Sequence, residues 1–137
     1  MAVQALNHIG IAVESIDGQK PFYEGALGLE FEGLEEVPSQ KVRVGFFRAS
    51  NVRIELLEPT APDSPVAKFL EKRGEGLHHL AFTVEDIQAR IAELKQNGLT
   101  MIDEQPRTGA HHMNIAFVHP KSTFGVLTEL CEPKAPA

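Results

Sequence analysis

The sequence contains a single cysteine, Cys131, and comparatively few basic residues. One thiol cannot form an intrachain disulfide, and it cannot supply a zinc site built from several cysteines. Thirteen lysines and arginines stand against nineteen aspartates and glutamates, so the formal net charge is −6 at pH 7. Binding to nucleic acid phosphates requires a clustered excess of basic side chains, and the sequence shows no such cluster. We therefore expect no nucleic acid partner.

Long apolar runs are also missing. The longest runs have the length of a strand and fall well short of the roughly 20 residues that cross a bilayer. The first residues lack the basic and apolar regions of a signal peptide. We therefore expect a cytoplasmic protein with no membrane partner. A length of 137 residues and a hydrophobic content of 42% fit one compact domain with a real core.

What the sequence does contain is an internal repeat. His8 and His79 each begin an alternating pattern that leads through a valine and a glutamate to a helix start, and they are 71 positions apart (79 minus 8). A glutamate within an otherwise apolar run recurs in the same way, as Glu55 and Glu129, 74 positions apart (129 minus 55). Two equivalent modules that pack about a pseudo-two-fold axis would bring equivalent positions toward each other.

The apolar periodicity predicts an α+β fold of two tandem βαβββ modules, at about residues 5–58 and 77–132. A linker helix over about residues 64–73, capped by Ser64, joins them. In the first module we expect a helix over residues 20–26, capped by Asp17. The strands expected there cover residues 5–13, 29–37, 42–48 and 52–57. In the second module we expect a strand from residue 77, a helix over residues 87–96 and strands over residues 100–103, 114–118 and 126–131.

His8, Glu55, His79 and Glu129 together form a set of metal ligands. An unpaired buried carboxylate costs several kcal/mol, so such groups are usually paired, protonated or bound to metal. Nitrogen and oxygen donors without thiolate suit Co²⁺, which we place first, and also Mn²⁺, Ni²⁺, Zn²⁺ or Fe²⁺. A six-coordinate ion would keep two open positions for substrate oxygens and would act as a Lewis acid. The alternative is a pair of His–Glu hydrogen bonds at a module interface.

Three further residues are candidates for substrate binding. Lys121 and Ser122 lie in a His-Pro-Lys-Ser turn between the last two strands, where a cation could bind a carboxylate or a phosphate. His111 lies in a turn-like Gly-Ala-His-His segment that could shape the mouth of a pocket. The alternative for both segments is a solvated loop. His78 points to the strand face opposite His79, so we expect a structural role for it.

Several segments together carry a resemblance to a known family. Leu-Leu-Glu-Pro at 56–59, the run at 63–70, Gly-Leu-His-His at 76–79 and His-Pro-Lys-Ser at 119–122 followed by Gly-Val-Leu resemble the methylmalonyl-CoA epimerases. These enzymes belong to the vicinal oxygen chelate, or glyoxalase-like, superfamily, and the resemblance runs from residue 8 to residue 132. The sequence differs from some relatives at Val44, where they carry a glutamate. It also differs at His112 and Phe124, where small residues are usual.

The resemblance implies an isomerase that interconverts the R and S forms of methylmalonyl-CoA at C2, through a metal-stabilised enolate. It implies an acyl-CoA substrate, a homodimer, and metal ligation by His8, His79 and Glu129, with Glu55 as the fourth ligand. Inverting a stereocentre by removal and return of a proton is easiest with one base on each face. Glu55 and Glu129 are the candidate catalytic pair, because the pseudo-two-fold would set them on opposite sides of the substrate.

Two other functions fit the same fold. One is a glyoxalase I-like lactoylglutathione lyase, which shares the metal and the 1,2-proton shift and which activity on a glutathione hemithioacetal would favour. The other is a non-catalytic small-molecule-binding protein, in which the two glutamates would form only hydrogen bonds. The metal content of the purified protein separates the enzymes from the binding protein.

Overall fold

A computed structural model describes residues 3–134, which form two compact units. The N-terminal unit comprises residues 8–78, and the C-terminal unit comprises residues 3–7 together with residues 79–134. The chain passes between the units inside two strands, β1 (Val3–Ala12) and β5 (Gly76–Val84). His8 and His79 are the first residues after these two crossings. The prediction that the units form a single domain stays a prediction.

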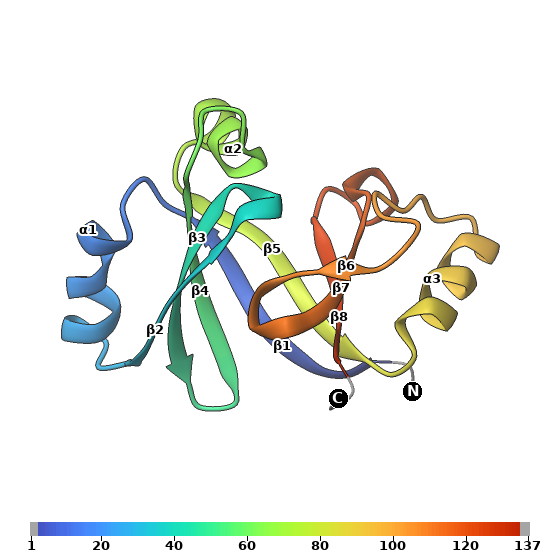
Figure 1. Ribbon diagram of the computed structural model, residues 1–137, viewed down its shortest axis with the longest axis horizontal. Helices are drawn as coiled ribbons and strands as arrows, with labels where there is room; N and C mark the ends of the chain where they lie inside the picture. Colours follow the sequence, from blue (N-terminus) through green and yellow to red (C-terminus); the bar gives the residue numbers. More distant parts are fainter. Residues whose placement is uncertain (1–2, 135–137) are drawn as a thin grey trace. The chain divides into compact units, whose positions relative to one another are not determined.

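The N-terminal unit is a sheet with the strand order β2-β3-β4-β1. Strands β2 (Glu30–Val37), β3 (Val42–Ala49) and β4 (Val52–Pro59) are antiparallel neighbours, and β1 runs parallel to β4. Helix α1 (Ile16–Lys20) and the π-helical turn η1 (Pro21–Ala26) flank these strands in Figure 1. A buried cluster of Val13, Ile16, Phe47 and Leu56 fills the space under the helices. The unit also contains the short helix η2 (Pro38–Gln40) and helix α2 (Pro65–Arg73).

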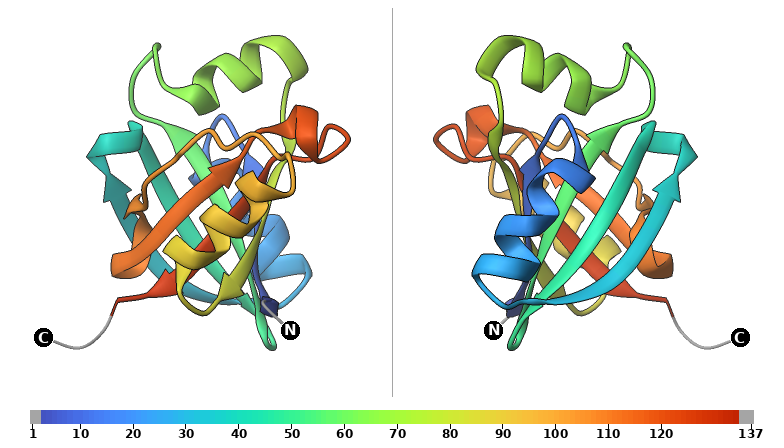
Figure 2. Two further views of the ribbon diagram at one scale, coloured as in Figure 1. Left: turned by 90° about the vertical axis from the view of Figure 1, so that its right-hand side faces the viewer. Right: turned by 90° about the vertical axis from the view of Figure 1, so that its left-hand side faces the viewer.

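The C-terminal unit repeats this plan with the strand order β5-β8-β7-β6. Strand β8 (Thr128–Pro133) runs parallel to β5, and β7 (Met113–Val118) and the short β6 (Arg107–Thr108) are antiparallel to their neighbours. Helix α3 (Ile87–Gln96) covers β7 and β8, as Figure 2 shows in its left view. Its buried residues Ile87 and Ile91 belong to the core cluster beneath it. Two short helices, η3 (Ala110–His112) and η4 (Pro120–Ser122), occupy the loops on either side of β7.

Of the two helix caps predicted from the sequence, one is confirmed and one is wrong. The Ser64 hydroxyl accepts a hydrogen bond from the Ala67 N–H at 3.0 Å and begins α2, as predicted. The Asp86 carboxylate caps α3 by accepting a hydrogen bond from the Ala89 N–H at 3.3 Å. The cap predicted at Asp17 is wrong, because the Ser15 hydroxyl caps the helix through the Gly18 N–H at 3.0 Å. Asp17 lies inside the first turn of α1, where its charge still suits the positive end of the helix dipole.

The helix predicted over residues 20–26 is therefore the second part of a longer helical segment. It begins at Ile16, and Pro21 falls between the α-helical and π-helical parts. Proline has no N–H to donate, so the regular bonding pattern is interrupted there. Beyond it the Leu27 N–H donates to the Phe22 carbonyl, five residues back.

The strand predicted over residues 100–103 is wrong. Only an isolated bridge between Met101 and Val118 forms there, and the edge strand β6 lies further along the chain. The backbone of this segment pairs with β7 only in part: the Ile102 N–H donates to the Phe117 carbonyl and the His119 N–H donates to the Thr100 carbonyl, each at 2.8 Å. The Asp103 carboxylate accepts the Phe117 N–H at 2.9 Å, which a neighbouring strand carbonyl would otherwise do.

Among the helices of residues 3–134, none is long and apolar enough to cross a membrane. The cytoplasmic location expected from the sequence stays a prediction.

Candidate functional site

The N-terminal unit contains a buried pair of His8 and Glu55. His8 lies on β1, and its Nδ1 is 3.2 Å from a carboxylate oxygen of Glu55 on β4. The residue directly opposite Glu55 on β1 is Gly10, two positions after His8 and therefore on the same face. With no side chain at Gly10, nothing on β1 at that level occupies the space beside the carboxylate. The strand alternation predicted for this segment thus sets the histidine against the glutamate.

The C-terminal unit contains the equivalent pair, His79 and Glu129, in which the other imidazole nitrogen faces the carboxylate. Nε2 of His79 lies 3.4 Å from a carboxylate oxygen of Glu129. Ala81, two positions after His79 on β5, is directly opposite Glu129 on β8. The repeat read from the sequence is therefore also a repeat in register. Each unit supplies one histidine, one glutamate and one small residue between them.

A phenylalanine that was not predicted from the sequence completes each copy. Phe46 is directly opposite Glu55 on β3, and Phe117 is directly opposite Glu129 on β7. The Phe117 ring meets the His79 ring edge-on, with centroids 5.5 Å apart. The spacing of the two phenylalanines, 71 positions (117 minus 46), equals that of the two histidines. This common spacing was the signal that could have revealed them.

All four polar side chains are buried: His8, Glu55 and His79 are 6% exposed and Glu129 is 5% exposed. Burial raises the pKa of Glu55 to about 8, because the charged carboxylate loses water; Arg53 opposes this effect and the negative charge of Glu35 adds to it. In the absence of a cation, Glu55 is thus largely protonated at pH 7. A positive ion that replaced the proton would stabilise the charged carboxylate.

The donor atoms of each pair fit a divalent ion as well as they fit a hydrogen bond. Two ligands about 2.1 Å from an ion and at right angles to each other lie about 3 Å apart. The separations of 3.2 and 3.4 Å are close to this value. Neutral imidazole nitrogens and carboxylate oxygens without thiolate suit Co²⁺, Mn²⁺, Ni²⁺ and Zn²⁺. The residues present therefore fit a metal centre.

His78, next to His79, lies in a different environment. Its ring meets the Phe69 ring of α2 edge-on, with centroids 5.0 Å apart. Desolvation by burial lowers the pKa of His78 to about 4, so the ring is neutral at pH 7. The packing against α2 agrees with the structural role expected for this residue.

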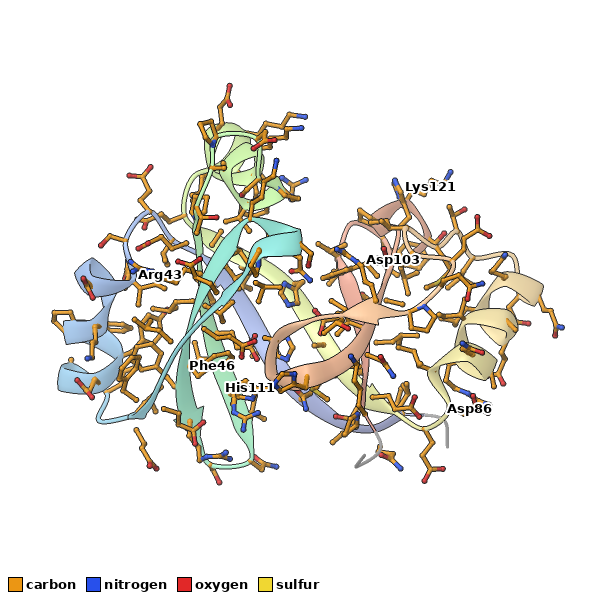
Figure 3. The ribbon with its side chains drawn as sticks, in the orientation of Figure 1. Arg43, Phe46, Asp86, Asp103, His111 and Lys121 are labelled. Atoms are coloured by element: carbon orange, nitrogen blue, oxygen red, sulfur yellow. The ribbon has the colours of Figure 1, made fainter. Side chains whose placement is uncertain are left out.

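The three candidate substrate-binding residues all lie in loops of the C-terminal unit. Lys121 projects from the loop after β7 (Figure 3), where the His119 ring accepts its backbone N–H at 3.0 Å. The Ser122 hydroxyl accepts the Thr100 N–H at 2.9 Å, so it ties this loop to its neighbour. His111 has a left-handed backbone, with φ of 57°, at the turn before β7. The roles in substrate binding stay predictions.

Comparison with known proteins identifies the family. Residues 7–117 match the model of the glyoxalase/bleomycin resistance protein/dioxygenase superfamily, and the chain belongs to this superfamily. An uncharacterized protein of Bacillus subtilis, YqjC, is 51% identical over 94% of this chain and 92% of its own. The ethylmalonyl-CoA/methylmalonyl-CoA epimerase of Cereibacter sphaeroides is 39% identical over 91% of this chain and 95% of its own.

The solved structures agree with the sequence comparisons. A methylmalonyl-CoA epimerase in complex with methylmalonyl-CoA and NH₄⁺ matches with a TM-score of 0.93 and 36% identity, over 98% of this chain and 97% of its own. The predicted glyoxalase-like fold and the resemblance to the epimerases are therefore confirmed. The relatives named as epimerases are isomerases, as expected for the chain.

Proposed function

We propose that the chain is a methylmalonyl-CoA epimerase, which interconverts the R and S forms of its substrate at C2. The observation that carries this proposal is the buried His–Glu pair that recurs, in the same register, in both units. The relatives named above support the choice of substrate. The proposal thus combines a site suited to a metal with a family that acts on acyl-CoA thioesters.

The proposed metal ligands are His8, Glu55, His79 and Glu129, holding one divalent ion. His8, His79 and Glu129 each offer a buried ligand atom of the kind that such an ion accepts. The resemblance to the epimerases favours one shared ion over two separate sites. We expect Co²⁺, with Mn²⁺, Ni²⁺ and Zn²⁺ as alternatives.

In the proposed reaction, Glu55 and Glu129 are the two proton-transfer groups. One carboxylate removes the proton from C2, and the other carboxyl group, which must be released from the ion to carry a proton, returns one to the opposite face and inverts the stereocentre. When bound, a divalent ion supplies Lewis-acid stabilisation of the negative charge that develops beside C2. Each turnover leaves the two carboxyl groups with exchanged protonation states, and exchange with solvent restores them.

A turnover assay with a single stereoisomer tests this function. Incubation of S-methylmalonyl-CoA with Co²⁺-loaded protein should give a mixture of both isomers, measured by consumption in an assay specific for the R form. Activity on a glutathione hemithioacetal, with none on methylmalonyl-CoA, would instead identify a glyoxalase I-like lyase. Binding of methylmalonyl-CoA with no turnover in the presence of metal would identify a binding protein.

We further propose that the loop containing Lys121 binds the phosphates of coenzyme A. Lys121 is exposed, and the hydrogen bonds of His119 and Ser122 hold its loop in place. An exposed ion pair contributes up to about 1 kcal/mol, so Lys121→Ala should raise KM for methylmalonyl-CoA about two- to fivefold. The same variant should not change KM for a pantetheine thioester that lacks the nucleotide. An equal rise for both substrates would contradict phosphate binding.

The resemblance to the epimerases also leads us to propose a homodimer. Light scattering at micromolar concentration should therefore give twice the 15.0 kDa mass of one chain. The mass of a single chain under the same conditions would refute the dimer.

A further inference from the structure

Arg107 occupies the edge strand of the C-terminal unit, on the face that contains the His79–Glu129 pair. It is directly opposite Ile115 on β7. Ile115 and Phe117 are two positions apart and so share one face of the sheet, and Phe117 is directly opposite Glu129. The register therefore places the Arg107 side chain on this face, two strands away from Glu129.

The contacts of Arg107 direct its guanidinium toward the same pair. Its central carbon lies 5.8 Å from the centroid of the Phe117 ring, and Phe117 in turn packs edge-on against His79. A cation over an aromatic face is attracted by the ring electrons. The aromatic side chain thus forms a platform between the guanidinium and the histidine.

The Asp103 carboxylate contacts both Phe117 and Arg107. One carboxylate oxygen accepts the Phe117 N–H at 2.9 Å, and the other lies 3.1 Å from Arg107 Nε. Figure 3 labels Asp103 in the segment that leads from α3 to β6. Although the two groups are close, the buried Nε–H makes no hydrogen bond within residues 3–134. Asp103 therefore places a negative charge beside the guanidinium without accepting a hydrogen bond from its Nε.

The internal repeat is broken at this position. Val44 in the N-terminal unit corresponds to Ile115, 71 positions apart (115 minus 44), and the residue opposite Val44 is Glu35. Equivalent places in the two units thus carry opposite charges, Glu35 in one and Arg107 in the other. A carboxylate therefore meets a cation at this position of the C-terminal unit, whereas the equivalent position of the N-terminal unit carries an acidic side chain.

We infer that Arg107 is a substrate-binding residue that recognises the free carboxylate of the acyl group. Its planar fork of donors matches a carboxylate, and no proton has to move for it to be charged. In this assignment Lys121 binds the phosphates of coenzyme A, and Arg107 binds the carboxylate of the malonyl group. The inference rests on the proposed epimerase function, because that function supplies a substrate with a carboxylate beside C2.

Two ligands that differ only in this carboxylate provide the test. Calorimetry measures the Kd of racemic methylmalonyl-CoA and of propionyl-CoA for the native protein and for Arg107→Gln. Removing a charge-assisted hydrogen bond should weaken methylmalonyl-CoA binding about tenfold to hundredfold. Propionyl-CoA binding should not change. Arg107→Lys, which keeps the charge but not the fork, should lie between the two and replaces the glutamine variant if that protein does not fold.

The matched control is Arg90→Gln. Arg90 lies on α3 and pairs with Glu93 at 3.2 Å, so its removal should change the binding of neither ligand. Equal weakening of both ligands by Arg107→Gln would overturn the inference and assign Arg107 a role in the loop structure. Unchanged binding of methylmalonyl-CoA would also overturn it. Failure of the proposed function would be visible separately, as native protein that binds methylmalonyl-CoA without epimerising it.

Discussion

His79→Ala is expected to abolish metal binding and epimerase activity together while the protein stays folded. The imidazole is one of the two metal donors that the C-terminal unit supplies, and its partner Glu129 lies 3.4 Å away. Even groups that only orient ligands typically cost 10- to 100-fold when removed, so the loss of a ligand should reduce turnover on the order of 10²-fold or more. Elemental analysis of protein purified without chelator and the turnover rate measure the two effects.

The neighbouring residue provides the control for this experiment. His78→Ala removes an imidazole of the same size, one position away on the other face of β5, where it packs against Phe69. We expect a small loss of stability and nearly full metal content and activity. A fully metallated, active His79→Ala protein would contradict the proposed site. Equal losses in the two variants would mean that the effect comes from the strand and not from metal ligation.

Glu55→Gln is expected to lower turnover on the order of 10²-fold or more, the usual contribution of a positioned base. The amide oxygen can still bind metal, so the metal content should be retained. If Glu55 serves one face of C2, solvent deuterium should still enter one stereoisomer in this variant and not the other. Unimpaired exchange in both isomers would show that Glu55 is a ligand only.

The protonation of Glu55 gives this variant a second readout. Since burial raises the pKa of the metal-free carboxyl group to about 8, metal binding at pH 7 must displace its proton. Calorimetry in buffers of different ionisation enthalpy should therefore detect proton release by the native protein. The glutamine variant should lack this component. Equal proton release by both proteins would show that the displaced proton comes from a group other than Glu55.

The sequence predicted most of the strands and helices because their apolar periodicity is local. It also predicted the four residues of the two pairs, because a repeat reveals equivalent positions without any knowledge of contacts. Which histidine pairs with which glutamate could not be predicted from the sequence. That depends on the parallel register of β1 with β4 and of β5 with β8, which sets small residues opposite the carboxylates. Neighbouring strands that are distant in sequence leave no local signal of their register.

The errors have equally local causes. Ser15 and Asp17 are both good caps, and only the extended backbone at Ser15 decides between them. The two-residue strand β6 is too short to show alternation, and the side chain of Asp103 replaces part of the expected ladder. No periodic pattern therefore indicated Arg107, although it lies on the face of the candidate site.

Deuterium exchange at C2 of methylmalonyl-CoA tests the central claim most directly. A single stereoisomer is incubated in deuterated water with protein loaded with Co²⁺, and in parallel with protein treated with EDTA. The proposed mechanism predicts deuterium at C2 and formation of the opposite isomer with Co²⁺, and loss of both after EDTA treatment. Exchange at an undiminished rate in EDTA would contradict the metal centre, and no exchange with Co²⁺ would contradict the epimerase.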